Sequence, residues 1–207
     1  KKFSIPFKKT TIIKNVFLAT REPSTVNYQL PVKKVVLWAG RMLYLKNLYR
    51  LIRAFVRINS GGYELHLIGE GTEKGRLEKF IKEEKIKEVK IFPSLPHDKL
   101  LERIFQAAFL VLPSLSDVGP NVVADSIGVL TPFLMTKESG FFENFKDVGV
   151  FFNPLSEKDL EESIKILMDE KERQGYKERL KKISLSRGWK EAAKEWLSLF
   201  QSASQSS

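Results

Sequence analysis

"KVVLWAGRMLYLKNLYRLIRAFVRI" (residues 34–58) places the pattern of a buried strand beside the pattern of an amphipathic helix. The run after Lys34 is apolar, begins with two valines and ends at Gly40, as expected of a strand whose two faces are both covered. Beyond a loop, apolar residues recur at helical spacing and form one stripe: Leu48, Leu51, Ile52, Phe55 and Val56. The segment therefore predicts a strand, a loop and a helix in succession.

The same alternation continues along the chain. Further strand patterns occupy residues 63–71, 89–92, 109–114, 132–135 and 149–152. Helix patterns lie between them, at residues 73–84, 97–108 and 120–128. Because such alternation joins parallel strands through crossover helices, we expect an α/β fold: a doubly wound, mainly parallel Rossmann-like sheet with helices on both faces and a helical C-terminus.

The C-terminal part is predicted to be helical. Ser156 and Asp159 have the spacing of a capping box, and the residues after them share one apolar face: Leu160, Ile164, Leu167 and Met168. A last helix over residues 187–200 aligns four residues that we interpret as core or docking positions, before a frayed tail: Trp189, Ala193, Trp196 and Phe200. We divide the chain into a hinge segment and edge strand (1–33), a Rossmann-like domain (34–186) and a C-terminal helix with its tail (187–207).

Composition limits the classes of function. The 207 residues are 43% apolar, which suits a packed core, and contain no cysteine, which excludes disulfides and fits a reducing compartment. Lysine and arginine exceed the acids, 35 − 25 = +10, a charge that suits nucleic acid, an anionic membrane surface or phosphorylated small molecules. Many of these bases lie in mixed runs such as 82–90 and 177–182, which are typical of solvated helix faces. No apolar run approaches the roughly 20 residues of a membrane span.

The loops at the carboxyl ends of the predicted strands carry the chemistry that we expect. In a doubly wound sheet, ligands bind at this edge, where the strand order reverses. Pro120 suits the first helical position and would leave the amides of residues 121–123 free for an anion, beside Arg41 and Lys46. Asp117 and Asp125 lie 125 − 117 = 8 positions apart and would accept hydrogen bonds from two different sugars. The pattern predicts a site for a diphosphate flanked by sugar hydroxyls.

Each of these residues also has a purely structural interpretation. Arg41 and Lys46 can be surface bases, and an aspartate such as Asp117 commonly occupies a turn or a helix cap. Asp125, within a helix, is of a type that is usually solvated.

The two histidines and the first loop are interpreted structurally. His66, within an apolar strand, is expected to be a hydrogen-bonded core residue, and His97, after a proline, is expected to start a helix. The loop after the first strand has one glycine where a dinucleotide fingerprint needs three, so a hydride-transfer enzyme is disfavoured.

Six motifs follow one another in a familiar order. They are "IIKN" ending at Asn15, "GRMLYLKN" (40–47), "LHLIGEG" (65–71), "PSLSDVGPNVVADSIGVLTPFL" (113–134), "SGFFE" with Gly140 and Glu143, and "WKEAAKEWLSLF" (189–200). Together they resemble the C-terminal, donor-binding half of GT-B fold retaining glycosyltransferases of the glycosyl transferases group 1, or family four, type. The resemblance covers nearly the whole chain.

The resemblance implies roles for individual residues. Arg41, Lys46 and Asp117 would be catalytic, with the two bases on the phosphates and Asp117 against the transferred sugar. Asp125 would bind the ribose hydroxyls. The remaining donor-binding residues would be Gly40, Ser94, Leu95, Gly119, Pro120, Asn121 and Val122. The donor would be a nucleotide sugar, UDP- or GDP-linked, with no metal and no other cofactor.

The resemblance also implies partners that are not in this chain. The full enzyme would have an N-terminal acceptor domain, so the chain alone would be inactive. It would transfer a hexose to a glycan or lipid-linked acceptor in polysaccharide biosynthesis, in the cytoplasm at the inner membrane face, without binding nucleic acid.

Two alternatives remain from the sequence. The first is a catalytically degenerate nucleotide-sugar-binding module, because Asp117 and Asp125 stand where the family has glutamates and Pro93 where it has glycine. The second, suggested by the charge, is a basic nucleic-acid-binding domain.

Overall fold

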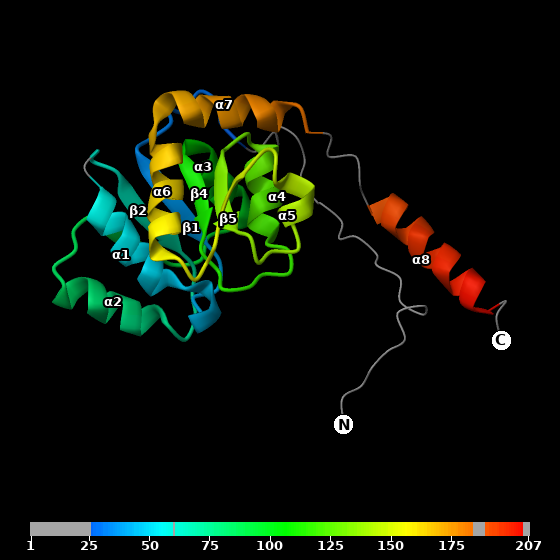
Figure 1. Cartoon of the computed structure of the whole chain (residues 1–207), viewed down its shortest axis with the longest axis horizontal. Coiled ribbons are helices and arrows are strands. Elements are labelled where there is room, and N and C mark those ends of the chain that lie inside the picture. Colours follow the sequence, from blue (N-terminus) through cyan, green and yellow to red (C-terminus); the bar gives the residue numbers. More distant parts are fainter. Residues whose placement is uncertain (1–25, 60, 184–188, 205–207) are drawn as a thin grey trace. The chain divides into compact units, whose positions relative to one another are not determined.

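The computed structural model describes residues 26–59, 61–183 and 189–204 (Figure 1). Those up to Ile183 lie in one compact unit, and α8 (Trp189–Ser204) belongs to a second. The predicted hinge residue Asn15 and most of segment 1–33 lie outside the described residues.

A single parallel sheet organises the first unit. Within the described residues it has six strands in the order β3-β2-β1-β4-β5-β6, and every neighbouring pair is parallel. The strands are β1 (Val35–Ala39), β2 (Glu64–Ile68), β3 (Val89–Phe92), β4 (Phe109–Leu112), β5 (Phe133–Thr136) and β6 (Val150–Phe152). Val36 is paired with Leu65 on one side and with Phe109 on the other, so β1 and β4 are central. The predicted doubly wound fold is confirmed.

Helices connect the strands and cover both faces of the sheet. They are α1 (Leu48–Ile58), α2 (Lys74–Glu83), α3 (His97–Gln106), α4 (Asn121–Gly128), α5 (Phe142–Phe145), α6 (Glu157–Met168) and α7 (Glu170–Lys181), with a 3₁₀ turn η2 (Tyr44–Lys46) before α1. Right-handed crossovers place α1 and α2 on one face and α3 and α4 on the other, because the chain winds in opposite directions from the centre. The contact between α3 and α4 agrees with this arrangement, and α1 also packs against α6.

The core lies where the sequence predicts it. All residues of β1, β4 and β5 are buried, and large aromatic side chains such as Trp38, Phe109 and Phe133 have no exposed surface. The predicted stripe of α1 is buried except for Val56, which is exposed, while Ala54 is buried in its place.

The predicted capping box before α6 forms only in part. Ser156 Oγ accepts a hydrogen bond from the amide of Asp159 (3.1 Å), as a capping residue should. The carboxylate of Asp159 instead accepts from the amide of Asn153 at 2.7 Å, because the amide of Ser156 already donates to the carbonyl of Asn153. One side of the box is therefore replaced by a loop contact.

The end of helix α7 lies in the run 177–182 that we interpreted as a solvated helix face, yet a buried side chain anchors this helix. Arg173 is buried on α7 and donates to the hydroxyl of Tyr63 and to the carbonyls of Leu167 and Met168. Figure 1 shows α7 lying across one end of the sheet. The guanidinium thus ties α7 to α6 and to the start of β2.

Helix α8 extends further than the sequence indicates. It runs to Ser204, into the segment expected to fray. The rings of Trp196 and Phe200 stack with centroids 5.8 Å apart, and both side chains are exposed. In the part of the chain that the structure describes, we find no helix with the length and apolar character that crossing a membrane requires.

Candidate functional site

The chain reverses its direction of winding between β1 and β4, and this switch point is where a doubly wound sheet binds ligands. Two loops meet there, 40–47 after β1 and 113–120 after β4. The amide of Leu115 donates to the carbonyl of Leu45 (2.8 Å), and the side-chain amide of Asn47 donates to the carbonyl of Pro113 (3.2 Å). The two loops are therefore held side by side, as the sequence hypothesis required.

An ion pair joins the two loops at the switch point. Lys46 Nζ lies 2.5 Å from Asp117 Oδ2, and Ser114 Oγ donates to the same oxygen at 3.2 Å. The side chain of Lys46 is 25% exposed and that of Asp117 is 13% exposed, so the pair is partly withdrawn from water. Ser114 is fully buried, so its hydroxyl holds the carboxylate from the protein interior.

The backbone of Asp117 joins a third loop to this site. Its amide donates to the carbonyl of Glu138 (2.9 Å), and its carbonyl accepts from the amide of Gly140 (3.0 Å). A Cβ atom at Gly140 would lie 2.1 Å from the carbonyl oxygen of Val118, so no other residue fits without a backbone shift. The "SGFFE" segment therefore supports the position of Asp117.

The N-terminus of α4 differs from the prediction in one respect. Pro120 has φ −74° and ψ 114° and is the N-cap residue, so the helix begins at Asn121 rather than at the proline. The amide of Val123 donates to the carbonyl of Pro120 (3.0 Å) and is not free. Among the described residues the amides of Asn121 and Val122 have no acceptor, and these two remain for an anion.

Asp125 has a partner that the sequence analysis did not predict. His97 Nε2 lies 3.0 Å from Asp125 Oδ1, with the histidine side chain 68% exposed and the aspartate 14% exposed. His97 is the first residue of α3, as expected, but its contact with α4 was missed. The signal in the sequence was its position just after the loop that follows β3, at the carboxyl edge of the sheet.

The other predicted residues occupy the same edge of the sheet. Arg41 is exposed, and no ion pair of its guanidinium is found with the residues that the structure describes. Ser94 is exposed and Leu95 half-buried in the loop after β3. Gly40 lies against the next loop, because a Cβ atom at Gly69 would be 1.9 Å from its carbonyl oxygen.

Glu143 and His66 lie outside this cluster. Glu143 is on α5 and its carboxylate pairs with Lys146 at 2.9 Å. His66 is buried in β2 with Nε2 2.8 Å from Glu64 Oε2, which confirms it as a hydrogen-bonded core residue. Burial lowers the pKa of His66, and the hydrogen bond to Glu64 opposes that effect.

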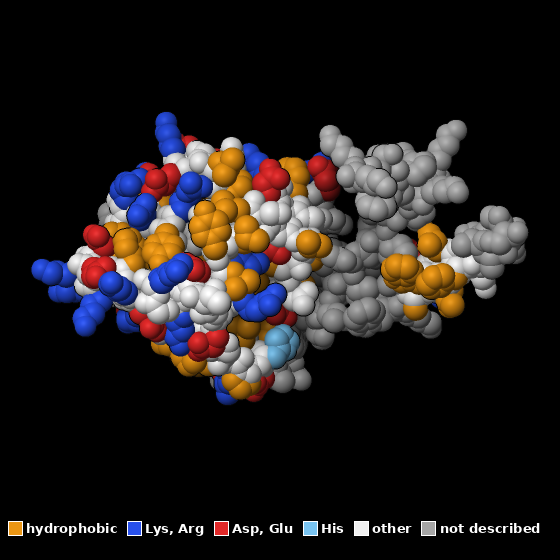
Figure 2. All heavy atoms as spheres, turned by 90° about the horizontal axis from the view of Figure 1, so that it is seen from below, with side chains coloured by type: hydrophobic (Ala, Val, Ile, Leu, Met, Phe, Trp, Pro, Cys, Tyr) orange, Lys and Arg blue, Asp and Glu red, His pale blue; other side chains and the backbone are white. Residues whose placement is uncertain are grey.

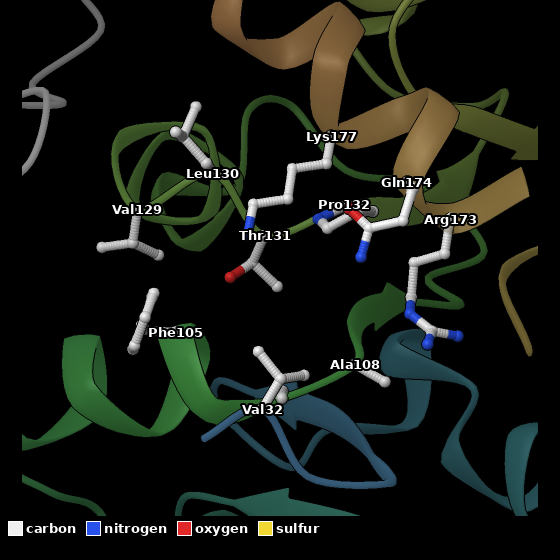
Figure 3. A pocket seen from close by; sticks show the side chains of 11 residues that line it. Val32, Phe105, Ala108, Val129, Leu130, Thr131, Pro132, Arg173, Gln174 and Lys177 are labelled. Atoms are coloured by element: carbon white, nitrogen blue, oxygen red, sulfur yellow. The ribbon is translucent and has the colours of Figure 1, made fainter. Parts of the chain in front are cut away.

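A separate pocket lies at the opposite, amino end of the strands (Figure 3). Its walls come from the segments before β4 and β5 and from α7, with Ala108, Thr131 and Lys177 among its lining residues. Arg173 also lines the pocket, and its guanidinium donates to the carbonyls of Leu167 and Met168. We assign no function to this pocket.

The site combines the groups that a sugar-linked diphosphate requires. A lysine and two free amides at a helix N-terminus attract anionic oxygens, and two carboxylates accept hydrogen bonds from hydroxyls. In the described part of the chain, no group of three or more histidine or acidic side chains could hold a metal ion.

Comparison with known families identifies the family to which the sequence is similar. The sequence model of the family described as "Glycosyl transferases group 1" matches residues 26–187. No curated protein matches the sequence.

Similar solved structures share the fold at low sequence identity. A mutant of S. aureus TarM, in complex with Fondaparinux, alpha-GlcNAc-glycerol and UDP, is 15% identical with a TM-score of 0.66, over 92% of this chain and 38% of that one. Sucrose-phosphate synthase from Thermosynechococcus elongatus is 20% identical with a TM-score of 0.68, over 94% and 52%. WaaG, a glycosyltransferase involved in lipopolysaccharide biosynthesis, is 17% identical with a TM-score of 0.69, over 86% and 55%. The chain thus spans 38% to 55% of the length of these three proteins.

Proposed function

The chain belongs to the glycosyl transferases group 1 family, and from that premise we propose that it is the nucleotide-sugar-binding domain of a retaining glycosyltransferase. The observation that carries the proposal is the meeting of Lys46, Asp117 and the N-terminus of α4 at the switch point of the sheet. A hexose linked to UDP or GDP is the proposed donor.

The diphosphate is assigned to the bases and the helix N-terminus. Lys46 and Arg41 neutralise its charge, and the amides of Asn121 and Val122 donate to its oxygens. In the reaction, the bond from the anomeric carbon to the diphosphate oxygen breaks, and a bond from that carbon to the acceptor oxygen forms on the same face. The departing diphosphate takes the electron pair of the broken bond and gains charge, and one of its oxygens accepts the proton of the acceptor hydroxyl. Lys46, Arg41 and the amides stabilise that developing charge.

The carboxylates are assigned to the two sugars. Asp117 is paired with Lys46. In the proposed complex the diphosphate replaces the carboxylate as the partner of the ammonium group. The carboxylate then accepts hydrogen bonds from the transferred sugar. Asp125 keeps one oxygen on His97 and offers the other to the ribose.

The proposed enzyme is larger than this chain. The proposed organisation has a hinge segment and edge strand at 1–33, the donor domain at 34–186 and a C-terminal helix at 187–207, with an N-terminal domain supplying the acceptor site. The solved structures of which this chain covers only 38% to 55% support this organisation. A glycan or lipid-linked acceptor in polysaccharide biosynthesis, at the cytoplasmic membrane face, is part of the proposal.

A catalytically degenerate binding module is the second candidate. The specific observation in its favour is that the 2.5 Å pair with Asp117 already compensates the charge of Lys46. Nucleic-acid binding has less support. On the face that Figure 2 shows, basic side chains are interleaved with acidic ones. Several bases of the described residues also form ion pairs, such as Arg57 with Glu161.

Calorimetric titration of the 207-residue chain tests the ligand class. UDP or GDP should bind more tightly than the corresponding monophosphate, because the second phosphate meets Lys46 and the α4 amides. Single-stranded and duplex DNA should bind weakly and lose affinity steeply with salt. Tight DNA binding at physiological salt with no nucleotide binding would contradict the proposal.

A further inference from the structure

The pair of His97 and Asp125 is the strongest feature that the family assignment leaves unexplained. It joins two elements that are far apart in the sequence, since His97 starts α3 and Asp125 lies in the second turn of α4. Both helices begin at the carboxyl ends of strands, so the pair stands on the same edge of the sheet as Lys46 and Asp117.

The two partners differ in how far water reaches them. The imidazole is 68% exposed, whereas the carboxylate is 14% exposed. Because His97 Nε2 is only 3.0 Å from Asp125 Oδ1, a ligand hydroxyl that reaches this carboxylate also comes within reach of the ring. A ligand of Asp125 is therefore a neighbour of His97.

The chemistry of the pair suits a vicinal diol. A carboxylate has about four acceptor positions on its two oxygens, and His97 uses one of them on Oδ1. The second ring nitrogen, Nδ1, has no hydrogen-bond partner among the described residues, and the exposed ring also offers an aromatic face. The pair can thus accept one hydroxyl on Asp125 and contact the same sugar through the ring.

We propose that His97 is a specificity-determining residue of the donor site: it orients Asp125 and contacts the ribose of the bound nucleotide. The inference rests on the proposed function and adds a residue to that site. His66 provides the contrast, because its ring forms a similar bond to Glu64 but is buried in β2, where a ligand does not reach it.

The test compares three ligands on the 207-residue chain by calorimetry. They are whichever of UDP and GDP binds better, its 2′,3′-dideoxy analogue, and inorganic pyrophosphate. The variants are His97→Ala and His97→Gln, which keeps a hydrogen-bonding side chain. Lys99→Ala is the control, because Lys99 is an exposed residue of α3 whose ammonium pairs with Glu102 on the same helix.

His97→Ala should weaken the ribose nucleotide by about 3- to 10-fold, the range of one or two hydrogen bonds. Pyrophosphate affinity should not change, and the preference for ribose over dideoxyribose should shrink. His97→Gln should restore part of that preference, and Lys99→Ala should leave all three affinities unchanged.

Two results would overturn the inference while leaving the proposed function intact. One is a His97→Ala variant that prefers the ribose nucleotide over its dideoxy analogue as strongly as the wild type does. The other is an equal loss for pyrophosphate and nucleotide with a lower melting temperature, which would make His97 a structural residue. Failure of the wild-type chain to bind any nucleoside diphosphate would instead overturn the proposed function, and the inference with it.

Discussion

Lys46 and Asp117 lie 71 positions apart in the sequence, yet the ammonium nitrogen of one is 2.5 Å from a carboxylate oxygen of the other. The contact spans the two central strands of the sheet, where the direction of winding reverses. Because the carboxylate compensates the ammonium, an anionic ligand has to compete with Asp117 for Lys46. The charge available to a diphosphate therefore depends on both residues.

The first prediction concerns Lys46. Lys46→Ala should weaken binding of a nucleoside diphosphate by about 1–3 kcal/mol, the value of a charge-assisted hydrogen bond. The nucleoside without phosphate should be affected far less in calorimetric titration. Lys146→Ala is the matched control, because this lysine also pairs with an acid, Glu143, but lies outside the site. Equal losses for nucleoside and diphosphate would mean that Lys46 acts through folding.

The second prediction concerns Asp117. Asp117→Asn removes the negative charge beside Lys46, so the bare nucleoside diphosphate should bind as tightly as before or more tightly. The sugar-linked form should bind more weakly, because the carboxylate no longer accepts its hydroxyls. Loss of the partly buried ion pair should also destabilise the fold by about 1 kcal/mol. Parallel titrations and melting curves separate these effects, and a change in melting temperature alone would refute the assigned role.

The sheet and the position of the site could be predicted because both depend on local patterns. The central strands are short, continuous apolar runs, as in 35–39 and 109–112, and the winding rule then brings the loops after β1 and β4 together.

The remaining features depend on tertiary contacts that the sequence does not encode locally. The His97–Asp125 bond requires the relative placement of α3 and α4, which no spacing along the chain specifies. The packing of helix α7 on the domain could not be predicted, because its composition is highly charged. Its buried anchor, Arg173, is of a residue type that is expected to be exposed to water. The N-cap role of Pro120 depends on a ψ angle of 114°, which composition does not determine.

The third prediction concerns Gly140. Gly140→Ala places a methyl group 2.1 Å from the carbonyl oxygen of Val118, so the loop has to move and its bonds to Asp117 weaken. We expect a loss of about 1–3 kcal/mol in unfolding free energy, typical of overpacking. Gly175→Ala, in the middle of α7 with open space around it, is the control and should stabilise the fold by about 0.5–1 kcal/mol. Chemical denaturation measures both, and a Gly140→Ala variant as stable as the wild type would contradict the role of Gly140.

The fourth prediction concerns pH and His66. Burial lowers the pKa of His66 below the ordinary value of 6.5, while its hydrogen bond to Glu64 opposes the shift and the charges of Lys90 and Arg103 add to it. The unfolded chain therefore takes up this proton at a higher pH than the folded chain. The contribution of neutral His66 to the free energy of unfolding is complete above pH 6.5. It falls as the pH drops from 6.5 through the lower pKa of His66 in the folded chain.

Glu64 contributes in a different pH window, which allows the two groups to be separated. Its pKa is lowered from 4.5, chiefly by the hydrogen bond from Lys90, so its contribution is present above 4.5 and is lost below it. His66→Gln keeps a hydrogen-bonding side chain but does not titrate, and it should flatten the fall in unfolding free energy between about pH 7 and 5. The further fall below pH 4.5 should persist, since Lys90 still holds Glu64. Denaturation curves at several pH values test this, and an unchanged slope above pH 5 in the variant would show that His66 is not the group responsible.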